Sequence, residues 1–144
     1  MATPIQVVFD CADPERLATF WAEVLHYERQ RPPQGYASWE QFLAAVGVPK
    51  DEWNSASAIV DPDGKGPRIY FQRMDTPKPT KNRLHPDVNV GGGGKVPLEE
   101  RHARVDAEVE RLLALGATRL RVESDSREYW VVMADLEANE FCVQ

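Results

Sequence analysis

The sequence predicts an α+β fold in which one unit, a strand followed by a helix and three further strands, occurs twice along the chain. A short apolar strand opens each half, at residues 5–10 and again at residues 84–90. An amphipathic helix follows each of these strands, and turn residues separate the strands that come after it. Between the halves lies a polar, proline-containing run at residues 75–82, which is typical of a linker.

Composition limits the class of protein. The chain has 144 residues, of which 42% are hydrophobic, and this suits a single domain with a proper core. We expect residues 1–144 to form that domain, with module one at about residues 4–75, a linker at 76–82 and module two at 83–144. The net charge of -6 argues against nucleic acid as a partner, and no apolar run is long enough to span a membrane.

The chain ends also bear on location and redox state. Residues 1–6 lack the basic start and apolar stretch of a signal peptide, so we expect a cytoplasmic protein. Cys11 and Cys142 both stand in apolar, strand-like stretches. In a reducing compartment such cysteines are reduced core residues rather than a disulfide.

The first half begins with a strand and a capped helix. Asp13 is a good N-cap with Pro14 at the first helical position, and apolar residues then recur at helical spacing, at Leu17, Phe20, Trp21, Val24 and Leu25. The chain turns back into a strand at residues 27–30. Prolines and a glycine then interrupt it at residues 32–35.

A second helix in the first half has no counterpart in the second. Ser38 and Gln41 form a capping box, and the helix they open carries Trp39, Phe42, Leu43 and Val46 at helical spacing. Trp53 follows in a polar stretch without helical periodicity, which makes it more pocket-like than Trp39. Residues 56–60 and 68–74 are expected to form a hairpin around the turn at residues 61–64.

The second half repeats the order of the first. After its opening strand, the glycines at residues 91–94 form a loop without the Lys-Ser or Lys-Thr pair of a phosphate-binding loop. Pro97 opens a long helix and Gly116 ends it. The remaining strands are expected at residues 120–123, 129–133 and 140–143, with a turn at 135–139.

With these elements placed, the sequence resembles the vicinal oxygen chelate superfamily, and within it the bacterial glyoxalase-like domains of the glyoxalase/bleomycin resistance/dioxygenase type. The resemblance rests on DPERLATFWAEVL at 13–25, KNRLH at 81–85, VDAEV at 105–109 with LGA at 115–117, and DLEANEF at 135–141. It implies two βαβββ modules whose sheets curl around a cleft, in a homodimer. One fold of this kind hosts many activities, so the resemblance speaks to fold more than to reaction.

The resemblance also implies site residues. In metal-dependent members the ligands come from the first and last strands of each module and are typically His, Gln or Glu. Carried over residue by residue, they are Gln6, Gln72 or Tyr70, His85 and Glu140. Tyr70 and Gln72 lie two apart on one strand face, and we favour Gln72 because it is nearer the strand end. Glu140 is also the expected catalytic proton acceptor, and the expected substrate contacts are Gln6, Asp10, Trp53 and Tyr70.

This ligand set is chemically weak. One imidazole, one carboxylate and two neutral amides make a poor zinc site and only a moderate nickel, manganese or iron site. The turn at residues 135–139 carries Ala138 where the family usually has glycine, so we expect the turn to differ or Asn139 to carry its positive φ. Pro86 has no backbone N–H to donate to a neighbouring strand, so we expect its strand to lie at a sheet edge or to contain a bulge.

Two functional hypotheses follow. The first, which we favour, is a small-molecule-binding protein that holds an apolar or aromatic ligand in the cleft with weak or no metal, as antibiotic-sequestering relatives do. The alternative is an enzyme, a lyase, isomerase or dioxygenase that uses a divalent Ni, Mn, Fe or Zn ion on a small molecule with vicinal oxygens. Whether the protein is an enzyme at all is left open by the sequence.

Overall fold

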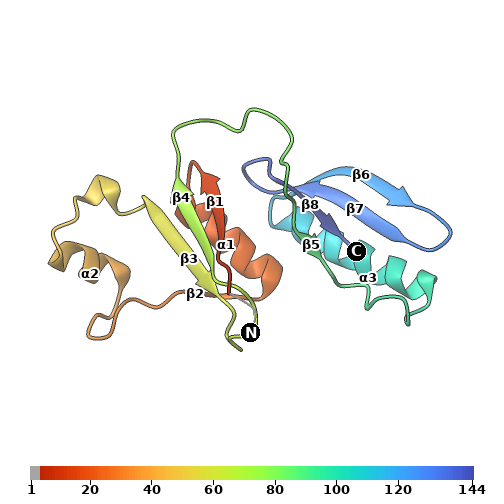
Figure 1. The fold of residues 1–144 in the computed structure, drawn as a ribbon, viewed down its shortest axis with the longest axis horizontal. Coiled ribbons are helices and arrows are strands. Elements are labelled where there is room, and N and C mark those ends of the chain that lie inside the picture. The colour runs from red at the N-terminus through yellow and green to blue at the C-terminus, as the bar shows by residue number, and fades with distance from the viewer. Residues whose placement is uncertain (1–3) are drawn as a thin grey trace. The chain divides into compact units, whose positions relative to one another are not determined.

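Two four-stranded sheets, each with its own helix, form the protein in the computed structural model, which describes residues 4–144 (Figure 1). The chain divides into two compact units, Met1–Pro77 and Lys78–Gln144. Each unit is a βαβββ-like module and neither sheet closes into a barrel, so the predicted α+β fold with tandem modules is confirmed.

The first sheet has the strand order β1-β4-β3-β2. Its β1–β4 pair is parallel, with Val7 of β1 opposite Ile69 of β4, and the other pairs are antiparallel. The strands are β1 (Val7–Cys11), β2 (Glu28–Arg29), β3 (Ala56–Val60) and β4 (Ile69–Arg73).

The second sheet repeats this arrangement with the order β5-β8-β7-β6. Asp87 of β5 lies opposite Cys142 of β8 in a parallel pair, and the remaining pairs are antiparallel. The strands are β5 (Asp87–Val88), β6 (Thr118–Ser124), β7 (Tyr129–Ala134) and β8 (Glu140–Val143). β5 is an edge strand, as Pro86 predicts, but it is much shorter than the expected 84–90.

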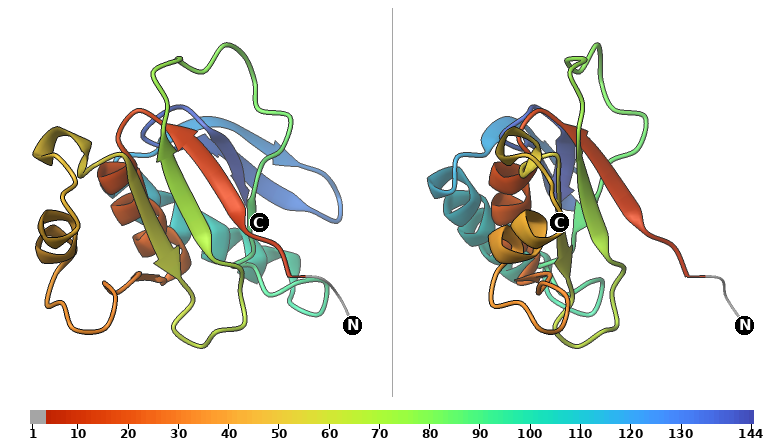
Figure 2. Two further views of the ribbon diagram at one scale, coloured as in Figure 1. Left: turned by 60° about the vertical axis from the view of Figure 1, so that its left-hand side comes forward. Right: turned by 90° about the vertical axis from the view of Figure 1, so that its left-hand side faces the viewer.

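Helix α1 (Pro14–Leu25) covers one face of the first sheet (Figure 2). The Asp13 carboxylate accepts a hydrogen bond from the Arg16 N–H at 3.2 Å, which confirms the predicted cap. The buried stripe of α1 includes Trp21, whose ring centroid lies 5.2 Å from that of Phe9 on β1. The core of this unit therefore sits between α1 and the inward residues of its sheet.

Helix α3 (Leu98–Ala114) covers one face of the second sheet in the same way (Figure 1). It buries Val105, Val109 and Leu112. On β8 the fully buried residues are Phe141 and Val143. Because side chains alternate along a strand, their neighbours Glu140 and Cys142 point to the opposite side of the sheet. We call the side of each sheet away from its own helix the helix-free face.

The insertion forms α2 (Trp39–Ala45) and the short 3-10 helix η1 (Lys50–Glu52). The Ser38 hydroxyl accepts from the Gln41 N–H at 3.3 Å, and the Gln41 side chain accepts from the Ala37 N–H rather than from Ser38. No residue of α2 is fully buried, so its apolar stripe is only half covered instead of packing into a core. The Trp39 indole N–H donates to the Gln30 carbonyl at 2.7 Å.

Two loop features differ from expectation or add to it. Ala138 has a φ of 64°, so Ala138 itself carries the positive φ that we assigned to Asn139 or to a different turn. The turn is held because the Asp135 carboxylate accepts from the N–H groups of Glu137 and Asn139, both at 2.9 Å. Within residues 4–144, none of the helices has the length and apolar character needed to cross a membrane.

Candidate functional site

Three predicted residues of the first module, Asp10, Tyr70 and Gln72, lie along the helix-free face of its sheet. In the parallel register Val8 stands opposite Tyr70, and Asp10 stands opposite Gln72. Their strand neighbours Phe9 and Phe71 point to α1, so these four side chains share the other face. The structure therefore brings Asp10 beside Gln72. It also brings Tyr70 beside Val8, which is 47% accessible.

Arg68 immediately precedes β4 and contacts Gln6, Gln30 and Tyr70. Its Nη1 donates to the Gln6 side-chain oxygen, and its Nε donates to the Gln30 side-chain oxygen at 2.7 Å. Its guanidinium carbon lies 5.0 Å from the Tyr70 ring centroid, within the range of a cation-π contact. Both hydrogen-bond acceptors are neutral, and among residues 4–144 no carboxylate forms an ion pair with this guanidinium. Its charge is consequently not neutralised within the described chain.

Trp53 lies just after η1 in the insertion. It is half-buried, its indole N–H donates to the Val48 carbonyl at 2.9 Å, and the Lys50 ammonium lies 5.9 Å from its ring. These contacts are all local to the insertion. A substrate-binding role for Trp53 stays a prediction.

In the second module, Glu140 at the start of β8 is tied to the connecting segment that precedes β5. Its carboxylate accepts from the Lys78 ammonium at 3.1 Å and from the Asn82 backbone N–H at 2.9 Å. Only 14% of the Glu140 side chain and 24% of the Lys78 side chain is exposed, so water screens this pair weakly. Burial opposes ionisation, but the hydrogen bonds from Asn82 and Lys78 outweigh it and lower the pKa of Glu140 to about 2. A carboxylate with that pKa is a weak proton acceptor near neutral pH.

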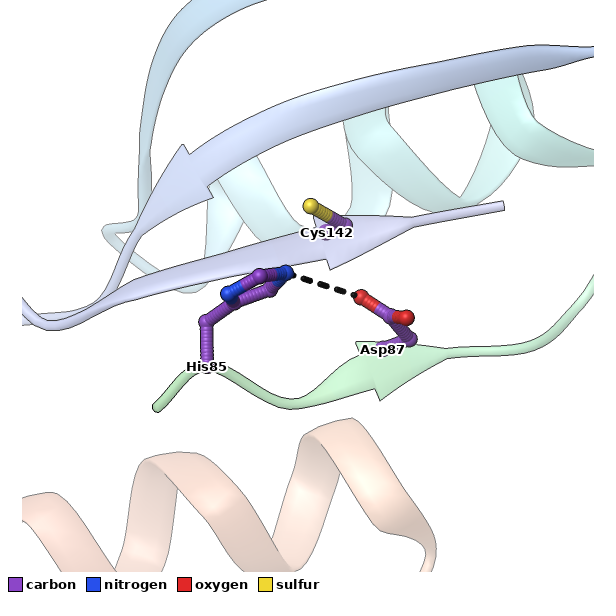
Figure 3. A group of neighbouring side chains, drawn as sticks. All are labelled: His85, Asp87 and Cys142. Atoms are coloured by element: carbon purple, nitrogen blue, oxygen red, sulfur yellow. Dashed lines mark ion pairs between the residues drawn. The ribbon is translucent and has the colours of Figure 1, made fainter. Parts of the chain in front are cut away.

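His85 contacts a different set of side chains. Its Nε2 lies 3.5 Å from the Asp87 carboxylate, and Cys142 of β8 completes a group of three whose ligand atoms all lie within 4.8 Å of one another (Figure 3). His85 and Asp87 are exposed, whereas Cys142 is buried. Such a group offers one nitrogen, one oxygen and one sulfur to a cation.

Charges around Cys142 act in opposite directions. Burial raises the pKa of the Cys142 thiol, and so do the negative charge of Asp87 and its hydrogen bond with the thiol. The cations Arg121 on β6 and Lys81 act the other way. The helix-free face of this module thus carries acidic and basic groups close together.

Sequence reasoning missed several of these residues. Asp87 and Cys142 lie two positions after His85 and Glu140, and the period of two along a strand would have placed each on the same face as its predicted neighbour. Arg68 lies two positions before Tyr70, so the same period would have placed it on the Tyr70 face, whereas Lys78 in the linker has no such signal.

The four-residue metal set implied by the resemblance fits a cation poorly here. The Gln6 oxygen already accepts from a guanidinium and Glu140 from an ammonium. A cationic side chain hydrogen-bonded to a ligand oxygen repels a metal ion, so the Arg68 and Lys78 side chains would have to be displaced before coordination.

Known structures share this fold along nearly its whole length. A glyoxalase/bleomycin resistance/dioxygenase family enzyme from Burkholderia phytofirmans is 16% identical, with 96% of this chain and 94% of that chain covered and a TM-score of 0.58. The fosfomycin resistance protein FosX from Listeria monocytogenes, as a point mutant complexed with Mn(II) and 1S,2S-dihydroxypropylphosphonic acid, is 14% identical. The match covers 100% of this chain and 90% of that chain at a TM-score of 0.62.

A possible glyoxalase from Bacillus cereus is 13% identical, with coverage of 100% and 99% and a TM-score of 0.59. No curated protein matches the chain in sequence. Identities this low establish fold alone, but a family model described as Glyoxalase-like domain matches residues 6–144. The chain therefore belongs to the glyoxalase-like domain family, within the vicinal oxygen chelate superfamily.

Proposed function

We propose that the protein binds a small molecule with an apolar or aromatic body and an anionic group, without a metal at the four-residue set. The observation that carries this proposal is the Arg68 guanidinium, which rests over the Tyr70 ring without a carboxylate partner among the described residues. A cation held beside an aromatic ring and an exposed valine offers an anion a partner and a flat ligand a surface.

Several features make Arg68 suitable as an anchor. Gln6 and Gln30 each accept one of its N–H groups, so the guanidinium is oriented before a ligand arrives. An oriented side chain loses less conformational entropy on binding. Val8 and Tyr70, side by side on β1 and β4, supply the apolar contact.

The test is a thermal-shift panel in the presence of EDTA. It compares aromatic carboxylates with the corresponding neutral amides on wild type, Arg68→Met and Arg31→Met. We expect carboxylates to raise Tm more than amides, and Arg68→Met to weaken carboxylate binding tenfold or more, about 1.4 kcal/mol. Arg31, whose side chain is 89% exposed, is the matched control and should bind as wild type. Equal binding by Arg68→Met, or no shift with any carboxylate, contradicts the proposal.

The second candidate is the metal-dependent enzyme. It is favoured by the His85, Asp87 and Cys142 group, and by the presence of Mn(II) and a vicinal diol in the FosX complex. In this case Glu140 would act as the proton acceptor, which requires that Lys78 first move away from its carboxylate and so let its pKa rise. The test is turnover of a small molecule with vicinal oxygens in the presence of Mn²⁺, Ni²⁺, Fe²⁺ or Zn²⁺. If such turnover appears and is lost in Glu140→Gln, the enzyme replaces the binding proposal.

We further propose a homodimer in the cytoplasm, on the resemblance and on sheet edges such as β5 and β6 that a second chain would cover. Light scattering at micromolar concentration should give twice the 16.3 kDa chain mass. A monomer at that concentration rules the dimer out.

A further inference from the structure

The group formed by His85, Asp87 and Cys142 is not used by the proposed binding function. It lies entirely within the second unit, with His85 on the segment that leads into β5, Asp87 on β5 and Cys142 on β8 (Figure 3). The parallel register places Asp87 directly opposite Cys142, and His85 precedes Asp87 by two residues on the same face. The backbone itself therefore brings the three side chains together.

The donor chemistry of this group favours zinc. Zn²⁺ binds imidazole nitrogen, carboxylate oxygen and thiolate sulfur, and sites with three protein ligands leave a fourth position for water or a ligand. Thiolate is a soft donor, which disfavours the hard cations Mg²⁺ and Ca²⁺. One thiolate and one carboxylate together also neutralise the charge of a divalent ion.

The distances permit such a site after small side-chain movements. Tetrahedral zinc with bonds of about 2.0 to 2.3 Å places its ligand atoms about 3.4 to 3.7 Å apart. His85 and Asp87 are already 3.5 Å apart, and all three ligand atoms lie within 4.8 Å. The His85 and Asp87 side chains are exposed, 42% and 43% accessible, so rotation about their side-chain bonds can close the remaining distance of about 1 Å to the zinc geometry.

We propose that the second module holds a zinc ion on His85 Nε2, the Asp87 carboxylate and Cys142 Sγ, with the fourth position open. On binding, the thiol proton of Cys142 is released to solvent and the Sγ–Zn bond replaces the S–H bond. This set differs from the family-derived set because it uses Asp87 and Cys142 and leaves Glu140 in its ion pair with Lys78. It goes beyond the proposed binding function and does not depend on it.

The experiment starts from protein stripped with chelator and titrates zinc, with Co²⁺ as a spectroscopic probe. We expect one ion per chain and a thiolate-to-cobalt charge-transfer band. Cys142→Ser should remove the band, and His85→Ala and Asp87→Asn should each weaken binding at least tenfold. Cys11→Ser, which changes the other buried cysteine, and Glu140→Gln should both keep the band and the stoichiometry.

Three outcomes overturn the inference: no zinc bound at micromolar concentration, a site that survives Cys142→Ser, or a site lost in Glu140→Gln. If Cys142→Ser does not fold, Cys11→Ser serves instead, because Cys142 is then the sole cysteine. Zinc should slow alkylation of that thiol at least tenfold in Cys11→Ser, and His85→Ala in the same background should abolish the protection. Alkylation at an unchanged rate contradicts zinc ligation.

Discussion

The two modules share a strand order but use their helix-free faces differently. In the first, a five-residue β1 carries Val8 and Asp10 alongside Tyr70 and Gln72, and one arginine organises neutral amides around it. In the second, β5 is reduced to two residues, and its face gathers ionisable groups. The shared topology thus fixes where the side chains lie, but their chemistry differs: an arginine beside Tyr70 in the first module, and a group of His, Asp and Cys side chains in the second.

The largest expected effect tests whether the two cores are equivalent. Phe71 on β4 and Phe141 on β8 are both fully buried in the central part of their sheets. We expect Phe71→Ala and Phe141→Ala each to lower the free energy of unfolding by about 3 to 5 kcal/mol, because each leaves a cavity. Urea denaturation measures both, and exposed Val8→Ala, expected within about 0.5 kcal/mol of wild type, is the control. If one variant loses less than half of the unfolding free energy that the other loses, the two cores are not equivalent.

The second prediction concerns the ion pair between Lys78 and Glu140 in the second module. Glu140→Gln leaves the Lys78 ammonium without its charged partner and should cost about 1.5 to 3 kcal/mol, as loss of a charged hydrogen bond does. Glu123→Gln removes an exposed pair with Arg121 and should cost less than about 1 kcal/mol. Equal effects in the two variants would mean that the Glu140 contact is no stronger than a surface pair.

The third prediction compares the two helix exits. α1 ends at Leu25 and is followed by His26 with a φ of 55°, whereas the corresponding residue after α3 is Gly116 with a φ of 100°. His26→Gly should raise stability by about 0.5 to 1 kcal/mol, because a side chain is strained in this region. Gly116→Ala should lower it by at least about 1 kcal/mol, since a Cβ there would lie 2.9 Å from Leu136 Cδ2. Ala138→Gly, at a φ of 64°, should stabilise like His26→Gly. Thermal unfolding that orders these variants otherwise would refute the strain argument.

The last prediction is a pH dependence that has no effect near neutral pH and appears only at high pH. Burial, together with the hydrogen bond from its hydroxyl to Asp106, raises the pKa of Tyr129 to about 12. The unfolded value is about 10, so the folded state holds this proton more tightly. That contribution to stability is complete below about pH 10 and is lost as pH rises from about 10 to about 12. Ultraviolet titration should show a late tyrosinate step that Tyr129→Phe removes, and titration complete before about pH 11 would contradict it.

Local signals predicted the fold well. Asp13 and Ser38 mark helix starts because caps are made by residues near in sequence, and alternation along β4 placed Tyr70 and Gln72 on one face. The length of β5 and the half-buried state of α2 were not predictable in this way, because both depend on what the rest of the chain provides as a neighbour.

The candidate site was predictable in part. The positions of Gln6, His85 and Glu140 came from the resemblance, but their present partners did not. Arg68 and Lys78 reach their partners across 62 residues of sequence each, a separation at which pattern carries no information. Whether these residues act as the resemblance implies stays a prediction that the variants above address.

One feature of the sheets bears on how the chain is made. Every strand of the first sheet comes from residues 7–73 and every strand of the second from residues 87–143, so neither sheet waits for a strand from the other half. During synthesis at about 5 to 20 residues per second, the first module can complete its strand pairing while the second is still inside the ribosome. A nascent chain that is stalled once residue 77 has emerged from the ribosomal exit tunnel should then already protect the β1–β4 ladder from hydrogen exchange.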